Sequence, residues 1–159
     1  VTRISLGDFP LPIMNQDLEA EEGVPENAVK LERLLVTHDE VMICTPEYNG
    51  SMPPLLKNAI DWISRAKENG KSIRAFSGRI GCICSSSEGY FAGVRSASHL
   101  RQVLAHIQME VIAPQVSVPN ASEAFDENGD FRAERLRSGM NHACKVLIQE
   151  AVLHMRTDG

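Results

Sequence analysis

Short apolar runs alternate along this chain with longer stretches whose apolar residues recur at helical spacing. The apolar runs show little alternation, as is typical of strands that are buried on both faces. They predict strands at 40–44, 79–84 and 109–118. The periodic stretches predict helices at 25–36, at 54 to about 66, at 97–107 and from 133 onward. The run Glu68 to Lys71 is expected to end the second of these helices.

The amino-terminal residues follow a different pattern. Val1 to Leu6 alternates enough to predict a further strand, and Gly7 to Glu22 contains two prolines and several acids, which is typical of an irregular surface loop. Pro114 falls inside a predicted strand, so it is expected at a bulge or an edge. The resulting order of strand and helix in alternation predicts an α/β fold with three layers, in which helices cover both faces of a parallel sheet. We expect one domain spanning residues 1–159.

Composition narrows the class of protein. The net charge of −5 comes from interspersed acids and bases, and no basic stripe points to a nucleic-acid partner. No apolar run approaches the length of a membrane span, and the amino terminus lacks the series of a secretory signal. We therefore expect a cytoplasmic protein that acts on small molecules.

Four cysteines occur, and three of them, Cys44, Cys82 and Cys84, lie in predicted strands. Cys82 and Cys84 would point to the same face of one strand, which suits either a metal or redox site or small buried apolar residues. We favour buried, reduced thiols, because no Cys-x-x-Cys or paired histidine spacing indicates a metal ligand set.

The stretch Thr45 to Pro54 joins a predicted strand to a predicted helix and is rich in turn-forming residues. Its prolines restrict the backbone, and Gly50 permits a positive φ and a close approach by a ligand. Backbone N–H groups from Glu47 to Ser51 are expected to be free of strand pairing, so they could face a planar, hydrogen-bonding ligand. A plain turn without a ligand is the alternative.

A second loop, Ser85 to Gly93, follows another predicted strand and again combines hydroxyls, glycines and aromatic rings. The carboxyl ends of parallel strands meet at one edge of a sheet, where ligands of α/β proteins bind. Two such loops at one edge favour a binding cleft over two unrelated turns.

The stretch from Thr45 to Arg65, TPEYNGSMPPLLKNAIDWISR, closely resembles the signature of the NADPH-dependent FMN reductase family. That family has a flavodoxin-like fold and includes flavin, quinone, chromate and azo-dye reductases. Gly7 to Pro12, followed by Asn15 to Glu19, is similar to the segment after the family's second strand. The resemblance covers essentially the whole chain, more loosely after Gly93.

The resemblance implies that both loops hold the flavin ring system. The residues that it implies as cofactor-binding are Pro46, Glu47, Tyr48, Asn49, Gly50, Ser85, Ser86, Glu88 and Gly89. Ser87, Tyr90 and Phe91 depart most from the family pattern. No residue is expected to be catalytic in its own right, since the flavin carries the chemistry, and no metal ligand is expected.

One element of the family is not found in the sequence. The family begins with a strand and a loop that cradles the FMN phosphate, and Val1 aligns with the family's second strand. In a sheet ordered 2-1-3-4-5 the first strand would lie between Val1–Leu6 and the strand at Glu40. We therefore expect an N-terminally incomplete domain that lacks about 30 to 40 residues, the scale of one βα unit.

The function implied is that of an FMN oxidoreductase, which passes hydride from NADPH or NADH to flavin and on to free flavin, quinone, chromate or an azo compound. The family also implies a homodimer or homotetramer. An alternative is an FMN-binding electron carrier without NAD(P)H turnover, and a third is a remnant that binds no flavin. The sequence indicates neither the acceptor nor the choice of nicotinamide cofactor.

Overall fold

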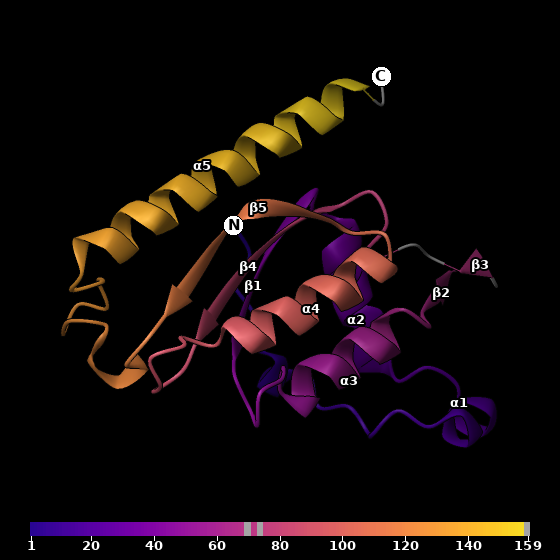
Figure 1. The fold of residues 1–159 in the computed structure, drawn as a ribbon. Coiled ribbons are helices and arrows are strands. Elements are labelled where there is room, and N and C mark those ends of the chain that lie inside the picture. The colour runs from indigo at the N-terminus through magenta and orange to yellow at the C-terminus, as the bar shows by residue number, and fades with distance from the viewer. Residues whose placement is uncertain (69–70, 73–74, 158–159) are drawn as a thin grey trace.

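Three parallel strands lie at the centre of the protein, in the order β1-β4-β5. The computed structural model describes residues 1–68, 71–72 and 75–157. The elements around the sheet follow in chain order: η1 (Leu6–Asp8), α1 (Gln16–Glu22), α2 (Glu26–Val36), β1 (Glu40–Pro46), α3 (Pro54–Ile63), β2 (Lys67–Glu68), β3 (Lys71–Ser72), β4 (Ile80–Ser86), α4 (Val94–His106), β5 (Glu110–Val118), η2 (Ala121–Glu123) and α5 (Glu134–Thr157). Figure 1 shows α5 alone along one face of the sheet, with α3 and α4 on the other.

Side chains of the central strand alternate between two apolar cores. Ile83 packs into the core under α3 and α4, whereas Ile80 and Cys82 pack into the core under α5. This period of two is the geometry of a strand with both faces covered. The predicted α/β layering, with a parallel sheet between helices, is confirmed.

The two edges of the sheet differ from its centre in burial. Six of the seven residues of β4 are buried, whereas only Thr45 is buried in β1. Among the described residues no strand pairs with the outer edge of β1.

The pairing of β5 with β4 is irregular at one point. The register shifts between Gly81 and Ile83 of β4, and Pro114 lies in the part of β5 opposite this shift. The prediction of a bulge or edge position for Pro114 is confirmed.

The predicted strand at Val1–Leu6 is wrong. Val1–Ser5 has no regular structure, and the chain then forms the 3-10 turn η1. A strand requires a hydrogen-bonded neighbour along its length, and no described strand runs beside this segment. An alternating pattern reports only local suitability for a strand, so it could not supply the missing partner.

The prediction of an irregular loop over Gly7–Glu22 is wrong in part, because the end of η1 and the whole of α1 lie within it. The Asn15 side chain caps α1 by accepting from the Asp17 N–H at 2.8 Å, and Gly23 ends the helix with a φ of 80°. Both signals are typical of helix ends. The helix buries no residue, so it lacks the apolar stripe on which the prediction relied.

The extended part of that segment is fastened to α3. The carbonyl oxygen of Pro12 accepts from Trp62 Nε1 at 2.8 Å and from Asn58 Nδ2 at 2.9 Å, and the Met14 N–H donates to Asn58 Oδ1 at 2.8 Å. Trp62, the only tryptophan, is fully buried. These hydrogen bonds hold the amino-terminal stretch against α3.

The remaining helices and strands fall close to their predicted ranges. α3 ends at Ile63 rather than near Ala66, and a short antiparallel pair, β2 and β3, follows it. Of the predicted helix end at Glu68–Lys71, Asn69 and Gly70 lie outside the described residues. The loop after β5 contains the 3-10 turn η2.

Candidate functional site

The first predicted loop forms a tight turn at the carboxyl end of β1. The Tyr48 N–H donates to the Ser51 carbonyl at 2.9 Å, and the Ser51 N–H donates back to Tyr48 at 3.0 Å. Asn49 and Gly50 between them have φ values of 50° and 79°. Two positive φ values between reciprocally bonded residues are the mark of a type I′ turn, for which Asn-Gly is the favoured sequence. The turn therefore follows from the residues at its tip.

This turn leaves fewer N–H groups available than the sequence predicts. The expectation that the groups from Glu47 to Ser51 are free of strand pairing is wrong for Glu47, whose N–H donates to the Ser86 carbonyl of β4 at 3.2 Å, and Tyr48 and Ser51 bond each other. Within the described part of the chain, the hydrogen bonds leave the N–H groups of Asn49 and Gly50 without a partner. These two donors lie at the tip of a rigid turn.

The first turn of α4 is hydrogen-bonded to the first loop. The Ser96 hydroxyl donates to the Pro46 carbonyl at 2.9 Å and lies 3.3 Å from the Thr45 hydroxyl. Ser96 and Thr45 are both buried, so their hydroxyl groups form hydrogen bonds within the protein instead of with water. At the far side of the turn, His99 Nδ1 lies 3.0 Å from the Ser51 hydroxyl.

A carboxylate joins the same loop to the same helix. Glu47 accepts from the backbone N–H of Arg95 at 3.2 Å and from its guanidinium Nη1 at 3.1 Å. Gly93, the N-cap residue of α4, has no side chain that could cap the helix. Glu47 therefore occupies the position where a negative charge interacts favourably with a helix N-terminus.

The second loop is folded tightly onto the ends of β4 and β5. The Ser85 hydroxyl, which is buried, donates to the Ala92 carbonyl at 2.9 Å and lies 2.9 Å from the Ser117 hydroxyl. Gly93 has a φ of 77°, and a Cβ there would lie 3.0 Å from Ser85 Cβ and from the Ser86 carbonyl oxygen. Only glycine fits this close approach. Ala92 also has a positive φ, of 55°.

The predicted binding residues of the second loop have different surroundings. Glu88 accepts from the Ser122 N–H and from its hydroxyl, at 3.1 and 2.8 Å, and so fastens the loop to η2. The carbonyl oxygen of Ser86 accepts a hydrogen bond from the Glu47 N–H of the first loop. Gly89 is exposed, and its carbonyl oxygen accepts from the Ser87 hydroxyl at 3.2 Å. The Ser85 and Glu88 side chains are thus already engaged in holding the loop.

A hollow of about 330 Å³ lies beside the second loop. Its lining comes from that loop, the start of α4, the end of β5 with the residue after it, and the start of α5: Tyr90, Phe91, Ala92, Val94, Ser117, Pro119 and Arg135. Tyr90 and Phe91 are exposed, and the Arg95 guanidinium lies 4.8 Å from the centre of the Phe91 ring. The two loops meet through Glu47, but the residues of the first loop do not line this hollow.

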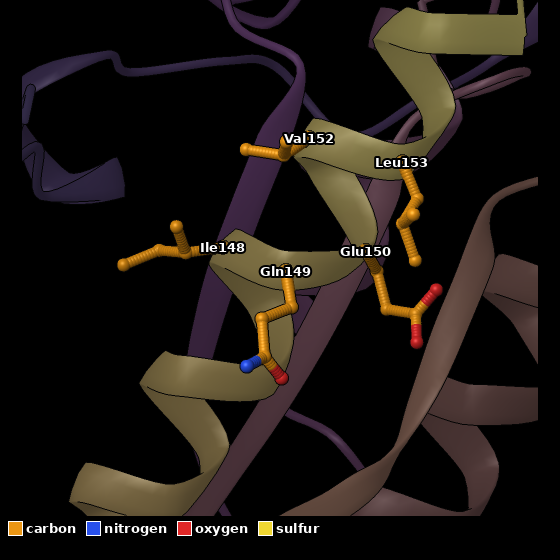
Figure 2. Close-up of a pocket in the computed structure, with 5 residues that line it drawn as sticks. All are labelled: Ile148, Gln149, Glu150, Val152 and Leu153. Atoms are coloured by element: carbon orange, nitrogen blue, oxygen red, sulfur yellow. The ribbon is translucent and has the colours of Figure 1, made fainter.

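A second hollow, of about 370 Å³, lies on the carboxyl-terminal half of α5. Figure 2 shows its lining residues, Ile148, Gln149, Glu150, Val152 and Leu153, projecting from that one helix. In Figure 1 this half of α5 lies toward the end of the sheet opposite the arrowheads, so the hollow is separate from the two loops.

The described part of the chain lacks the features of a metal site and of a membrane-spanning helix. No cluster of three or more His, Cys, Asp or Glu in it could hold a metal ion. None of its helices combines the length and the apolar character that crossing a membrane requires.

Three residues that hold the site were not identified from the sequence: Arg95, Ser96 and His99. All three lie on α4 and contact the first loop, from which they are separated by 48 to 50 residues. Sequence spacing carries no signal for such contacts. Gly93 was recognisable as a turn residue, and its position just before a helix was the one available hint.

Comparison with known proteins identifies the family of this chain and several of its relatives. The family described as NADPH-dependent FMN reductase matches residues 1–123. An NAD(P)H-dependent FMN reductase of Pseudomonas aeruginosa is 35% identical over 146 residues, which cover 91% of this chain and 76% of that protein. A 2-hydroxy-1,4-benzoquinone reductase of a Burkholderia species is 34% identical over 128 residues, which cover 80% of this chain and 67% of that protein.

Among solved structures, FerB of Paracoccus denitrificans, a flavoenzyme NAD(P)H:(acceptor) oxidoreductase, superposes with a TM-score of 0.77 at 26% identity. The match covers 94% of this chain and 78% of FerB. The sequence resemblance in the first loop and the similarity of the fold to FerB therefore agree. The chain belongs to the NADPH-dependent FMN reductase family.

Proposed function

We propose that this chain is an NAD(P)H-dependent FMN oxidoreductase that delivers electrons to a small acceptor such as a quinone or free flavin. Membership of the family supports the reaction class. The observation that carries the proposal to particular residues is the rigid turn at Asn49 and Gly50, whose two N–H groups are unpaired among the described residues. Such donors fit the oxygen and nitrogen atoms at the edge of a planar ring.

The residues of the two loops fit a flavin ring in different ways. Within the proposal, Asn49 and Gly50 donate N–H groups, and the exposed Tyr48 ring offers a flat apolar wall. The remaining cofactor-binding residues are Pro46, Glu47, Ser85, Ser86, Glu88 and Gly89. Glu47 and Ser85 would act by holding their loops in position, because their side chains already bond Arg95 and Ala92.

Bound FMN supplies hydride acceptance from the nicotinamide and electron delivery to the acceptor. The protein supplies binding and orientation. The N–H groups at the turn would favour the more negative, reduced ring, because preorganised donors stabilise charge that develops next to them. The exposure of both loops leaves room for nicotinamide and acceptor to reach the same edge in succession.

Titration with FMN followed by anaerobic addition of NADPH or NADH tests the proposal. The protein should bind FMN, and the visible flavin band should bleach within the turnover time of an enzyme. Gly50→Ala should weaken FMN binding roughly tenfold, about 1.4 kcal/mol, because a methyl group strains the turn at a φ of 79°. Gly129→Ala is the matched control, since its φ is 82° and it lies in another loop.

Each contrary result has a definite meaning. Failure to bind FMN would contradict the whole proposal. Binding without bleaching by either nicotinamide cofactor would favour the electron carrier. Equal FMN affinity for the Gly50 and Gly129 variants would exclude the first turn from the ring site.

A further inference from the structure

Three cysteine thiols lie together on the face of the sheet that α5 covers. Cys44 in β1 and Cys84 in β4 are direct partners in the parallel register, so their side chains point to the same face. Cys82 lies two residues before Cys84 on the same strand and shares that face. Cys82 and Cys84 belong to the core under α5, and all three thiols are free.

The geometry singles out one pair. Neighbouring strands are about 4.7–4.9 Å apart, which falls within the Cα separation of about 4.4–6.8 Å that a disulfide spans. Cys82 and Cys84 are instead separated along one strand by two residues, or about 6.6 Å, with parallel Cα–Cβ bonds. Their Cβ atoms are therefore much farther apart than the roughly 3.5–4.5 Å of a disulfide. Cys44 and Cys84 are the pair that can be bridged.

The two members of this pair have unequal access to solvent. Cys44 is exposed, whereas Cys84 is buried. Cys44 can therefore react with a reagent from solution, whereas the buried Cys84 is shielded from it. This is the arrangement of an attacking thiol with a protected thiol behind it.

The pKa values of the Cys44 and Cys84 thiols also differ. A hydrogen bond from the Cys84 S–H lowers the pKa of Cys44 to about 7 and lowers the pKa of Cys82 as well. The same bond raises the pKa of Cys84 above its ordinary value. Cys44 therefore forms the thiolate, which is the nucleophilic form of cysteine, at a lower pH than an ordinary thiol.

We propose that Cys44 and Cys84 form a peroxide-sensitive site, in which Cys44 is oxidised first and Cys84 resolves it as an intramolecular disulfide. The Cys44 thiolate attacks one oxygen of hydrogen peroxide, the O–O bond breaks, and after protonation one water leaves while Cys44 becomes a sulfenic acid. The Cys84 sulfur then attacks Cys44 Sγ, the S–O bond breaks, and the hydroxyl leaves as a second water with the Cys84 proton. Two thiols thus give two electrons and two protons to one peroxide.

The location of the disulfide gives it a consequence for the loops. Cys44 directly precedes Thr45 at the start of the first loop, and Cys84 directly precedes Ser85 at the start of the second. A bridge would join the bases of both loops. Because direct register partners must shorten their Cβ separation to form it, the bond is strained and readily reduced by a dithiol.

Peptide mapping after treatment with hydrogen peroxide tests the proposal. The oxidised protein should lose two of its four titratable thiols and yield one cross-linked peptide pair containing Cys44 and Cys84, and dithiothreitol should reverse both changes. Cys44→Ser should abolish the cross-link. Cys84→Ser should leave a sulfenic acid on Cys44 that a cyclic diketone reagent captures. Cys144→Ser, which alters the cysteine on α5, should behave as the wild type.

A second measurement needs no oxidation. The rate at which iodoacetamide alkylates Cys44 in the folded wild-type protein should rise with pH and reach half its maximum near pH 7. Cys84→Ala should move this midpoint upward, because the S–H donor is gone. A folded protein in which Cys44 is slower than the other thiols, a bridge to Cys82 or Cys144, or oxidation of Cys44 without a cross-link would each overturn the proposal.

Discussion

The carboxylate of Glu47 binds both the backbone N–H and the guanidinium of Arg95, at 3.2 and 3.1 Å, across 48 residues of sequence. Glu47 belongs to the loop that follows β1, and Arg95 lies in the first turn of α4. One side chain thus fastens the first loop and also caps the helix that begins where the second loop ends. The Glu47 N–H in addition donates to the Ser86 carbonyl, so this residue connects the two proposed flavin loops.

Replacing Glu47 with glutamine should destabilise the protein. Glutamine can still accept one hydrogen bond, but the charge that interacts with the guanidinium and the helix N-terminus is lost, at a cost of about 0.5–1.5 kcal/mol. Urea unfolding followed by the fluorescence of Trp62 measures the change. Asp61→Asn is the control, because it removes a surface ion pair with Lys57 and should cost at most about 0.5 kcal/mol. Equal costs would show that Glu47 is only another surface charge.

Replacing Gly93 with alanine should destabilise the protein more strongly. The left-handed backbone at a φ of 77° costs alanine about 1–2 kcal/mol. The added methyl group would in addition press on Ser85 and Ser86 at 3.0 Å, which adds about 1–3 kcal/mol. Gly78→Ala separates the two effects, since its φ is 76° and a Cβ there would meet no atom within 4 Å. If the Gly93→Ala and Gly78→Ala variants had the same free energy of unfolding, the second loop would have to move to accommodate the methyl group without cost.

Removing the buried hydroxyl of Ser96 should loosen the first loop. Ser96→Ala removes the 2.9 Å donor to the Pro46 carbonyl, which keeps the Thr45 hydroxyl as a donor at 3.0 Å, so the loss of one hydrogen bond should cost about 0.5–1.5 kcal/mol. Unfolding in urea gives the stability, and FMN titration shows whether the loop still binds the ring. Ser77→Ala is the control, because its hydroxyl donates to the Gln108 side chain in an exposed setting. A Ser96 variant no less stable than the Ser77 variant would contradict this role.

Local patterns predicted most of the fold. The apolar runs at β1, β4 and β5 and the helical stripes of α2, α3, α4 and α5 were recognisable because their residues face two packed cores. Helix α1 was missed although Asn15 and Gly23 mark its ends, since it buries no residue and so shows no stripe. Val1–Leu6 was mistaken for a strand because alternation does not show whether a neighbour is present to pair with it.

The sequence by itself determined the α/β order, the family, and the two turn-rich loops at the carboxyl ends of β1 and β4. It also determined the Asn-Gly turn, because the positive φ values at Asn49 and Gly50 are a property of those two residues. Only the tertiary structure decided which N–H groups the turn leaves available, that Glu47 caps α4, and that Cys44 lies beside Cys84. The bond from the Glu47 N–H to Ser86, the contact of Glu47 with Arg95 and the pairing of Cys44 with Cys84 join residues 39 to 48 positions apart. Such contacts depend on how strands align and helices pack, which no local pattern encodes.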